Sequence, residues 1–373
     1  SSSMRGAKIA RAKDAARAAL AQLRADDIVS VVAYDSTVSV LVPATKVSDR
    51  ETILRGIDRL QAGGMTALFA GTARGAAEVR KFFDRERVNR IVLLSDGQAN
   101  VGPSTPGELG RLGESLGREG IAVTTVGLGL GYNEDLMVAL ADNSGGQHAF
   151  AEHAHELAEL FDKGFGALAS IVAQEVVVQV TFAEGFRPVR SVGLDADVVG
   201  QKLTAHLAQL YGGQRDEVLL AFETDHLPAS AAQVATVQVT FHNMVTQAAD
   251  KLFETVSARF SHDVAVCERS RNDGVMVSVV AQVANERNEL ALRLRDEGKI
   301  EDAERTLDGN VVYLEQEARR YKSKTLGQLN EDNQQDRANL APERWNKQRK
   351  VMKKRAKQVK EKGSVYDFDD VLF

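Results

Sequence analysis

The chain has 373 residues, of which 47 are basic and 52 acidic, so its net charge at pH 7 is −5. This length is enough for roughly two or three domains, and a composition of 43% apolar and 27% charged residues is typical of folded rather than disordered protein. The longest apolar runs, such as Ile91–Leu94, fall far short of the ~20 residues of a membrane helix, and the single Cys267 excludes an intramolecular disulfide and a cysteine-based zinc cluster.

Residues 1–170 alternate between helical and strand-like patterns. Apolar residues spaced three or four apart predict a helix from Ile9 to Leu23, and IVSVVAY at 28–34 predicts a buried strand with a hairpin partner at 37–42. A capping box at 48–51 predicts a helix that extends to about residue 60. Further helices are predicted at 68–83, 106–118, 134–141 and 156–170, and strands at 90–94, 121–127 and 147–151. Strands this apolar are usually covered on both faces, so we expect a doubly wound α/β domain.

The pattern changes near residue 173. Strand-like runs with glycine turns between them, and no helical pattern, predict a small antiparallel β-sandwich at 173–261. The helical periodicity that follows is interrupted at Gly298, which predicts a helical hairpin at 264–323. Cys267, at the start of this region, is interpreted as a buried small apolar residue.

Residues 324–373 form a polar and basic tail. The segment NEDNQQDRAN predicts a loss of regular structure, and a helix is predicted at 343–362. The stretch at 344–362 holds ten Lys or Arg residues against one Glu, and could face phosphate groups or an anionic lipid surface. Because its charges lie all round the helix, we favour a solvated or self-docking helix and expect no nucleic-acid partner.

Three short polar segments lie where a predicted strand ends or a helix begins. They contain Ser1 and Ser3, Thr66, and Asp96. The carboxyl ends of strands in an open α/β sheet meet at one edge, where ligands bind. Hydroxyls and one carboxylate are hard oxygen donors, which suit Mg²⁺ better than zinc or copper. Because neutral ligands compensate little of its charge, the metal would remain electrophilic and could accept a carboxylate from a partner.

The motifs SxSMxGxK at 1–8, GGMTAL at 63–68 and LLSDGQANVG at 93–102, with the run VGLGLGYNEDLMVALADNSGG, resemble a von Willebrand factor type A domain. The resemblance covers about residues 1–170. It is strongest to bacterial members described as calcium-activated chloride channel-like, a description that does not itself imply channel activity.

The resemblance implies a metal-ion-dependent adhesion site with the pattern Asp-x-Ser-x-Ser, then a Thr, then an Asp. Ser1, Ser3, Thr66 and Asp96 match the last four of these ligands, so the implied cofactor is Mg²⁺, with Mn²⁺ or Ca²⁺ as alternatives. The first aspartate, two positions before Ser1, and the strand that carries it do not occur in this chain. The resemblance therefore implies a chain that begins inside the domain and a weakened metal site. It also predicts that strands 28–34 and 90–94 are not paired with each other, while Ser3 remains near Asp96.

Other interpretations of these residues are weaker. Ser3 or Thr66 alone would be read as helix caps, and Asp35 as part of a hairpin turn. The glycines at 127–131 lack the spacing of a dinucleotide-binding loop. His148, His153 and His155 could form a zinc site, but they lack a matching acidic or cysteine partner and are read as solvated surface.

The preferred function is a metal-dependent protein-binding module whose partner offers an Asp or Glu side chain. The alternative is a scaffold in which the C-terminal helical and basic segment carries the interaction and the first domain is structural. No acid–base pair and no nucleophile–base pair is visible, so an enzyme is not predicted.

Overall fold

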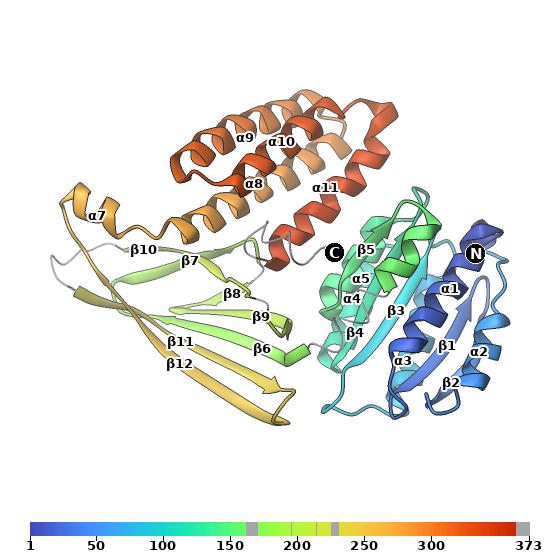
Figure 1. Ribbon diagram of the computed structural model, residues 1–373. Coiled ribbons are helices and arrows are strands. Elements are labelled where there is room, and N and C mark those ends of the chain that lie inside the picture. The colour runs from blue at the N-terminus through green and yellow to red at the C-terminus, as the bar shows by residue number, and fades with distance from the viewer. Residues whose placement is uncertain (162–170, 195, 214, 225–230, 363–373) are drawn as a thin grey trace. The chain divides into compact units, whose positions relative to one another are not determined.

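The computed structural model describes residues 1–161, 171–194, 196–213, 215–224 and 231–362 (Figure 1). The chain divides into two compact units. Among the described residues, the first contains those within 1–174 together with 244–247, and the second contains those within 175–243 and 248–362. Within the described ranges, no helix has both the length and the apolar character needed to cross a bilayer.

The first unit alternates helices and strands, as the sequence predicts. Its helices are α1 (Ala7–Gln22), α2 (Arg50–Asp58), α3 (Leu68–Arg80), α4 (Pro106–Arg118) and α5 (Glu134–Ser144), with short 3-10 turns η1 (Ser2–Met4) and η2 (Ala154–Glu156). Its strands are β1 (Ile28–Tyr34), β2 (Val38–Lys46), β3 (Asn89–Ser95), β4 (Ile121–Leu128) and β5 (His148–Ala151). Of the helix predicted at 156–170, residues 157–161 are helical, and 162–170 lie outside the described residues.

Helix α2 begins one residue later than the predicted capping box requires. The N-cap is Asp49, whose carboxylate accepts a hydrogen bond from the Thr52 amide at 3.2 Å. Ser48 remains in the preceding loop, where its amide donates to the Ala25 carbonyl. The prediction was wrong in this detail because an aspartate caps as well as a serine and its charge also favours the positive end of the helix dipole.

Strand β4 explains why this unit has helices on both faces of its sheet. Ile121 and Val123 point into a core formed with α3, α4 and α5, whereas Val126 and Leu128 point into a second core that includes residues of α1. Alternate residues of a strand face opposite sides, so a strand with apolar side chains on both faces needs two covering layers. The doubly wound α/β architecture predicted from the sequence is therefore confirmed.

The strands of this unit fall into two sheets. β1 pairs with β2 in an antiparallel hairpin, and β3, β4 and β5 form a parallel sheet in that order. The prediction that strands 28–34 and 90–94 do not pair is confirmed. Where the two strands end, the Tyr34 hydroxyl donates a hydrogen bond to the Leu94 carbonyl at 2.8 Å. Burial raises the pKa of Tyr34, so this hydroxyl stays protonated and remains a donor.

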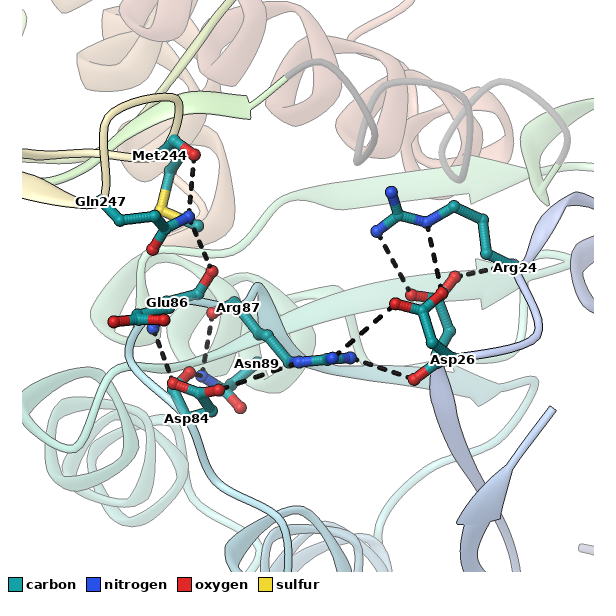
Figure 2. A network of polar contacts seen from close by, with 9 residues as sticks. Arg24, Asp26, Asp84, Glu86, Arg87, Asn89, Met244 and Gln247 are labelled. Atoms are coloured by element: carbon teal, nitrogen blue, oxygen red, sulfur yellow. Dashed lines mark hydrogen bonds and ion pairs between the residues drawn. The ribbon is translucent and has the colours of Figure 1, made fainter. Parts of the chain in front are cut away.

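An arginine links the starts of the same two strands (Figure 2). The Arg87 guanidinium, which precedes β3, donates to the Asp26 carbonyl, which precedes β1, at 3.0 Å. It also lies 3.7 Å from the Asp26 carboxylate and 3.8 Å from that of Asp84. Long side chains thus connect β1 and β3 at both ends, although no ladder of backbone hydrogen bonds joins the two strands.

The second unit begins with two sheets. One has the strand order β12-β11-β6-β9-β8 and the other pairs β10 with β7, and the pairs β7–β10, β8–β9 and β11–β12 are antiparallel. The strands are β6 (Ile171–Phe182), β7 (Phe186–Val192), β8 (Ala196–Val199), β9 (Lys202–Tyr211), β10 (Leu219–Thr224), β11 (Ala231–Asn243) and β12 (Ala248–Arg259). Phe182, Phe186 and Leu203 share one apolar core, so both sheets contribute to it.

Helices follow the strands. They are α7 (Val264–Ser270), α8 (Asp273–Asp296), α9 (Ile300–Tyr321), α10 (Lys324–Ala338) and α11 (Pro342–Lys362). The predicted helical hairpin corresponds to α8 and α9, with Gly298 between them at φ +80°. The interpretation of Cys267 as buried was wrong, because α7 has no buried residue and Cys267 is exposed.

Helix α10 replaces the loss of regular structure that the polar segment after 324 had predicted. Leu326 and Leu329 of α10 are buried in a core with α8, α9 and α11. The polar side chains Asn333 and Asp336 are buried as well; the Asn310 amide of α9 donates to Asn333 Oδ1 at 3.1 Å. The polar composition misled the prediction because these side chains are hydrogen-bonded inside the bundle instead of solvated.

Helix α11 confirms the helix predicted at 343–362 and docks on its own chain. Its apolar residues Met352, Ala356 and Val359 are buried. Its basic side chains form ion pairs with acidic groups of α8 and α10, namely Arg349 with Asp296, Arg355 with Asp332 and Asp336, and Lys360 with Glu289. Much of the positive charge seen in the sequence is therefore balanced within the second unit.

Asp336 makes the stability of this bundle depend on pH. Burial raises its pKa to about 6, although Arg355 and a hydrogen bond from Gln348 oppose the shift and Asp332 adds to it. Since the folded state holds this proton more tightly than the unfolded state, the stabilisation is complete below about pH 4 and is lost as the pH rises through 6. We expect the difference in unfolding free energy between the wild type and Asp336→Asn to change by up to ~1.4 kcal/mol per pH unit between pH 4 and 6. Urea titrations of both proteins across this range measure it, and parallel pH profiles would contradict it.

Candidate metal centre

Asp96 is the centre of the predicted site. It follows β3 directly, at the carboxyl end of the parallel sheet, and is 2% exposed. Its Oδ1 accepts a hydrogen bond from Ser3 Oγ at 2.6 Å, and its Oδ2 accepts one from Lys8 Nζ at 2.7 Å. The expectation that Ser3 lies next to Asp96 is therefore confirmed, and both carboxylate oxygens are engaged.

The serine hydroxyls form a chain that ends on this carboxylate. Ser1 Oγ lies 2.5 Å from Ser3 Oγ. A hydroxyl has a single proton to donate, and Ser3 gives its proton to Asp96, so Ser1 is the donor in the Ser1–Ser3 bond. The turn η1 holds both serines in place, because the Ser1 side chain also accepts from the Ser3 amide.

Thr66 is the third hydroxyl-bearing residue of the site, and its hydroxyl lies beside Gly97 with those of Ser1 and Ser3. A Cβ atom built on Gly97 would lie 3.3 Å from Thr66 Oγ1 and 3.5 Å from both Ser1 Oγ and Ser3 Oγ. The three predicted hydroxyls thus converge on one small space beside Asp96, which glycine leaves open. All four residues predicted from the sequence are brought together.

The backbone of Thr66 is fixed from two sides. Asn100 Oδ1 accepts from the Thr66 amide at 2.8 Å, and the Asn100 amide donates to the Thr66 carbonyl. On the other side, the Ala67 amide donates to the Asp35 carbonyl at 2.8 Å. Asp35 itself forms the expected hairpin turn, since hydrogen bonds from Thr37 hold its carboxylate and lower its pKa.

Lys8 is a site residue that the sequence analysis did not select. It lies in the first turn of α1, and helical side chains tilt toward the N-terminus, which brings its ammonium back to Asp96. Its position in SxSMxGxK was a usable signal, because a lysine in that turn can reach the residues that precede the helix. The Asp96 side chain is fully buried, whereas that of Lys8 is 36% exposed.

The glycine run after β4 forms a further wall of the site. A Cβ on Gly129, which has φ +74°, would lie 3.7 Å from Lys8 Nζ, and one on Gly131 would lie 3.3 Å from the Asp96 carbonyl. The side-chain amide of Gln98 donates a hydrogen bond to the Gly131 carbonyl at 2.9 Å. These glycines therefore let the loop pass close to Asp96 and Lys8.

The donor set fits a hard cation. Three hydroxyls and one carboxylate offer only oxygen atoms, which suit Mg²⁺, Mn²⁺ or Ca²⁺. In the described part of the chain, no group of three or more His, Cys, Asp or Glu side chains is placed to hold a metal. The three histidines weighed as a zinc site are not gathered: the rings of His153 and His155 stack at 5.6 Å, whereas His148 contacts Thr125 and Tyr132.

Sequence comparisons show which proteins the first unit is similar to. Residues 1–163 match the model of the von Willebrand factor type A domain family. The chain is 28% identical over 162 residues to the uncharacterized protein YfbK of Escherichia coli (strain K12), and 29% identical over 171 residues to the uncharacterized protein sll0103 of Synechocystis sp.. These matches cover 43% and 46% of this chain but 28% and 40% of the two relatives, so the matched part is less than half of each relative.

The fold agrees with this match. A von Willebrand factor type A structure from Catenulispora acidiphila superimposes with a TM-score of 0.68 at 18% identity, and covers 87% of this chain and 79% of its own. At this identity the likeness establishes the fold alone. Together with the family match and the doubly wound sheet, it supports a von Willebrand factor type A fold for residues 1–163.

Proposed function

We propose that the chain is a metal-dependent protein-binding module that recognises a carboxylate of its partner. The observation that carries this proposal is the convergence of three hydroxyls on the open space at Gly97, beside Asp96. Such an arrangement binds a cation without offering a base or a nucleophile with an activating partner, so we propose a binding role and not catalysis.

Ser1, Ser3, Thr66 and Asp96 would hold the metal ion. Bound there, the ion would supply an electrophilic position for an anionic oxygen. One carboxylate neutralises only half of the charge of a divalent cation, so the site would attract a further anion. An Asp or Glu side chain of a partner protein supplies such an oxygen.

The surroundings of the site favour a protein as the partner. Met65, next to Thr66, is 49% exposed, and Leu130, between the two glycines of the wall, is 39% exposed. Exposed apolar side chains that flank a polar anchor are typical of protein-binding surfaces. We therefore expect the recognised acidic residue to have apolar neighbours.

The test is a set of immobilised peptides with a central Asp or Glu, each matched with its Asn or Gln counterpart. We expect acidic peptides to retain the protein in Mg²⁺, EDTA to abolish retention, and the amide counterparts to retain nothing. Retention that is the same in Mg²⁺ and EDTA would contradict the proposal.

The alternative is a scaffold whose C-terminal helices carry the interaction. It predicts binding that is indifferent to EDTA and sensitive to charge changes on α11. The ion pairs of Arg349, Arg355 and Lys360 within the second unit make this helix a weaker candidate for an anionic partner. We expect neither nucleic acid nor a lipid surface as the partner. The calcium-activated chloride channel-like subgroup stays a prediction from the sequence motifs.

A further inference from the structure

The contact between Lys8 and Asp96 affects how readily the proposed site binds a metal ion. Asp96 is buried and carries the only carboxylate of the site, and an isolated buried charge is costly. The Lys8 ammonium, 2.7 Å from Oδ2, compensates that charge. With Lys8 in place, the carboxylate and ammonium together have no net charge.

A divalent cation would meet this ammonium as a competitor. Both cations draw on the same carboxylate, and two positive charges a few ångströms apart repel each other strongly where water is scarce. The three hydroxyls are neutral and cannot offset that repulsion. Gly129, in the wall of the site, has no side chain that could confine the Lys8 ammonium, and the Lys8 side chain is 36% exposed, which gives the ammonium a route to solvent.

We propose that Lys8 is a built-in counter-ion, which holds Asp96 when no metal is bound and must release it when a divalent cation binds. This inference rests on the proposed metal site and concerns its regulation. The exchange keeps Asp96 paired in both states and weakens metal binding. The site therefore fills only where the divalent cation is abundant.

The test compares the whole chain with Lys8→Met and Lys8→Gln. Both remove the ammonium; glutamine retains a hydrogen-bond donor and serves if the methionine variant folds poorly. Arg11→Gln is the matched control, because it removes a positive charge from the exposed side of the same helix without contacting Asp96. Mn²⁺ affinity is measured by calorimetry, and thermal unfolding is followed in EDTA and in excess Mn²⁺.

We expect both Lys8 variants to bind Mn²⁺ at least about tenfold more tightly than the wild type, with Arg11→Gln close to wild type. In EDTA the Lys8 variants should unfold at lower temperature than the wild type, and Mn²⁺ should raise their unfolding temperature more. If the wild type binds Mn²⁺ and the Lys8 variants bind it equally or less tightly, the counter-ion role is wrong and the metal site stands. If neither the wild type nor any variant binds Mn²⁺, the metal site and the counter-ion role both fail.

Discussion

Asp96→Ala is expected to abolish divalent metal binding. The substitution removes the only carboxylate among the four predicted ligands and leaves Ser3 Oγ without its acceptor. It also frees the Lys8 ammonium, whose charge then opposes any cation in the site. We expect Mg²⁺ and Mn²⁺ affinity to fall by at least ~100-fold, which in calorimetry leaves no measurable heat of binding.

Asp14→Ala is the control for this loss, because it removes an exposed carboxylate from helix α1 in the same unit. Its metal affinity should equal that of the wild type. Unchanged metal affinity in Asp96→Ala would show that any bound ion lies elsewhere and would remove the basis of the proposed site.

Gly146→Ala is expected to destabilise the first unit severely. A Cβ at this position would lie 2.1 Å from the Val123 carbonyl oxygen and 2.4 Å from its carbon, in the backbone of β4. Val123 is fully buried in the core under α4 and α5, so β4 cannot move away without disrupting that core. We expect a loss of about 3 kcal/mol or more in unfolding free energy, measured by urea titration.

Gly107→Ala is the matched control in the same unit. Gly107 lies in the first turn of α4, and the nearest atom to a new Cβ is the end of the Arg111 side chain at 3.9 Å. The helix should be unaffected or slightly stabilised, by up to about 1 kcal/mol. Equal unfolding midpoints for Gly146→Ala and Gly107→Ala would show that β4 and the turn before β5 are less closely packed than the structure indicates.

Most of the first unit could be predicted from the sequence because its local patterns and tertiary packing agree. β1 at 28–34 and α4 at 106–118 were placed to the residue: the first is apolar except for Ser30, and the second has a capping box and a proline at its start. The four site residues could be predicted because each follows a strand or precedes a helix, and the topology brings those points together.

What the sequence did not indicate depends on contacts between distant residues. Lys8 and Asp96 are 88 positions apart, so the motif at 1–8 places Lys8 near the site but does not reveal its ion pair with Asp96. Asn333 and Asp336 made α10 look solvated, although their partners Asn310 and Arg355 lie on α9 and α11.

The candidate metal ligands come from both sheets of the first unit, so a bound ion would also connect those sheets. Thr66 is tied through Ala67 to Asp35 at the end of β1, whereas Asp96 continues β3, so the ligands come from both sides of the seam between the sheets. Between the sheets, the side chains of Arg87 and Tyr34 form hydrogen bonds that connect β1 and β3, which share no backbone ladder. A cation bound by both Thr66 and Asp96 would cross-link the two sheets, and removal of the cation would weaken the contact between them. The stability of the domain would then increase with the fraction of sites that hold a cation.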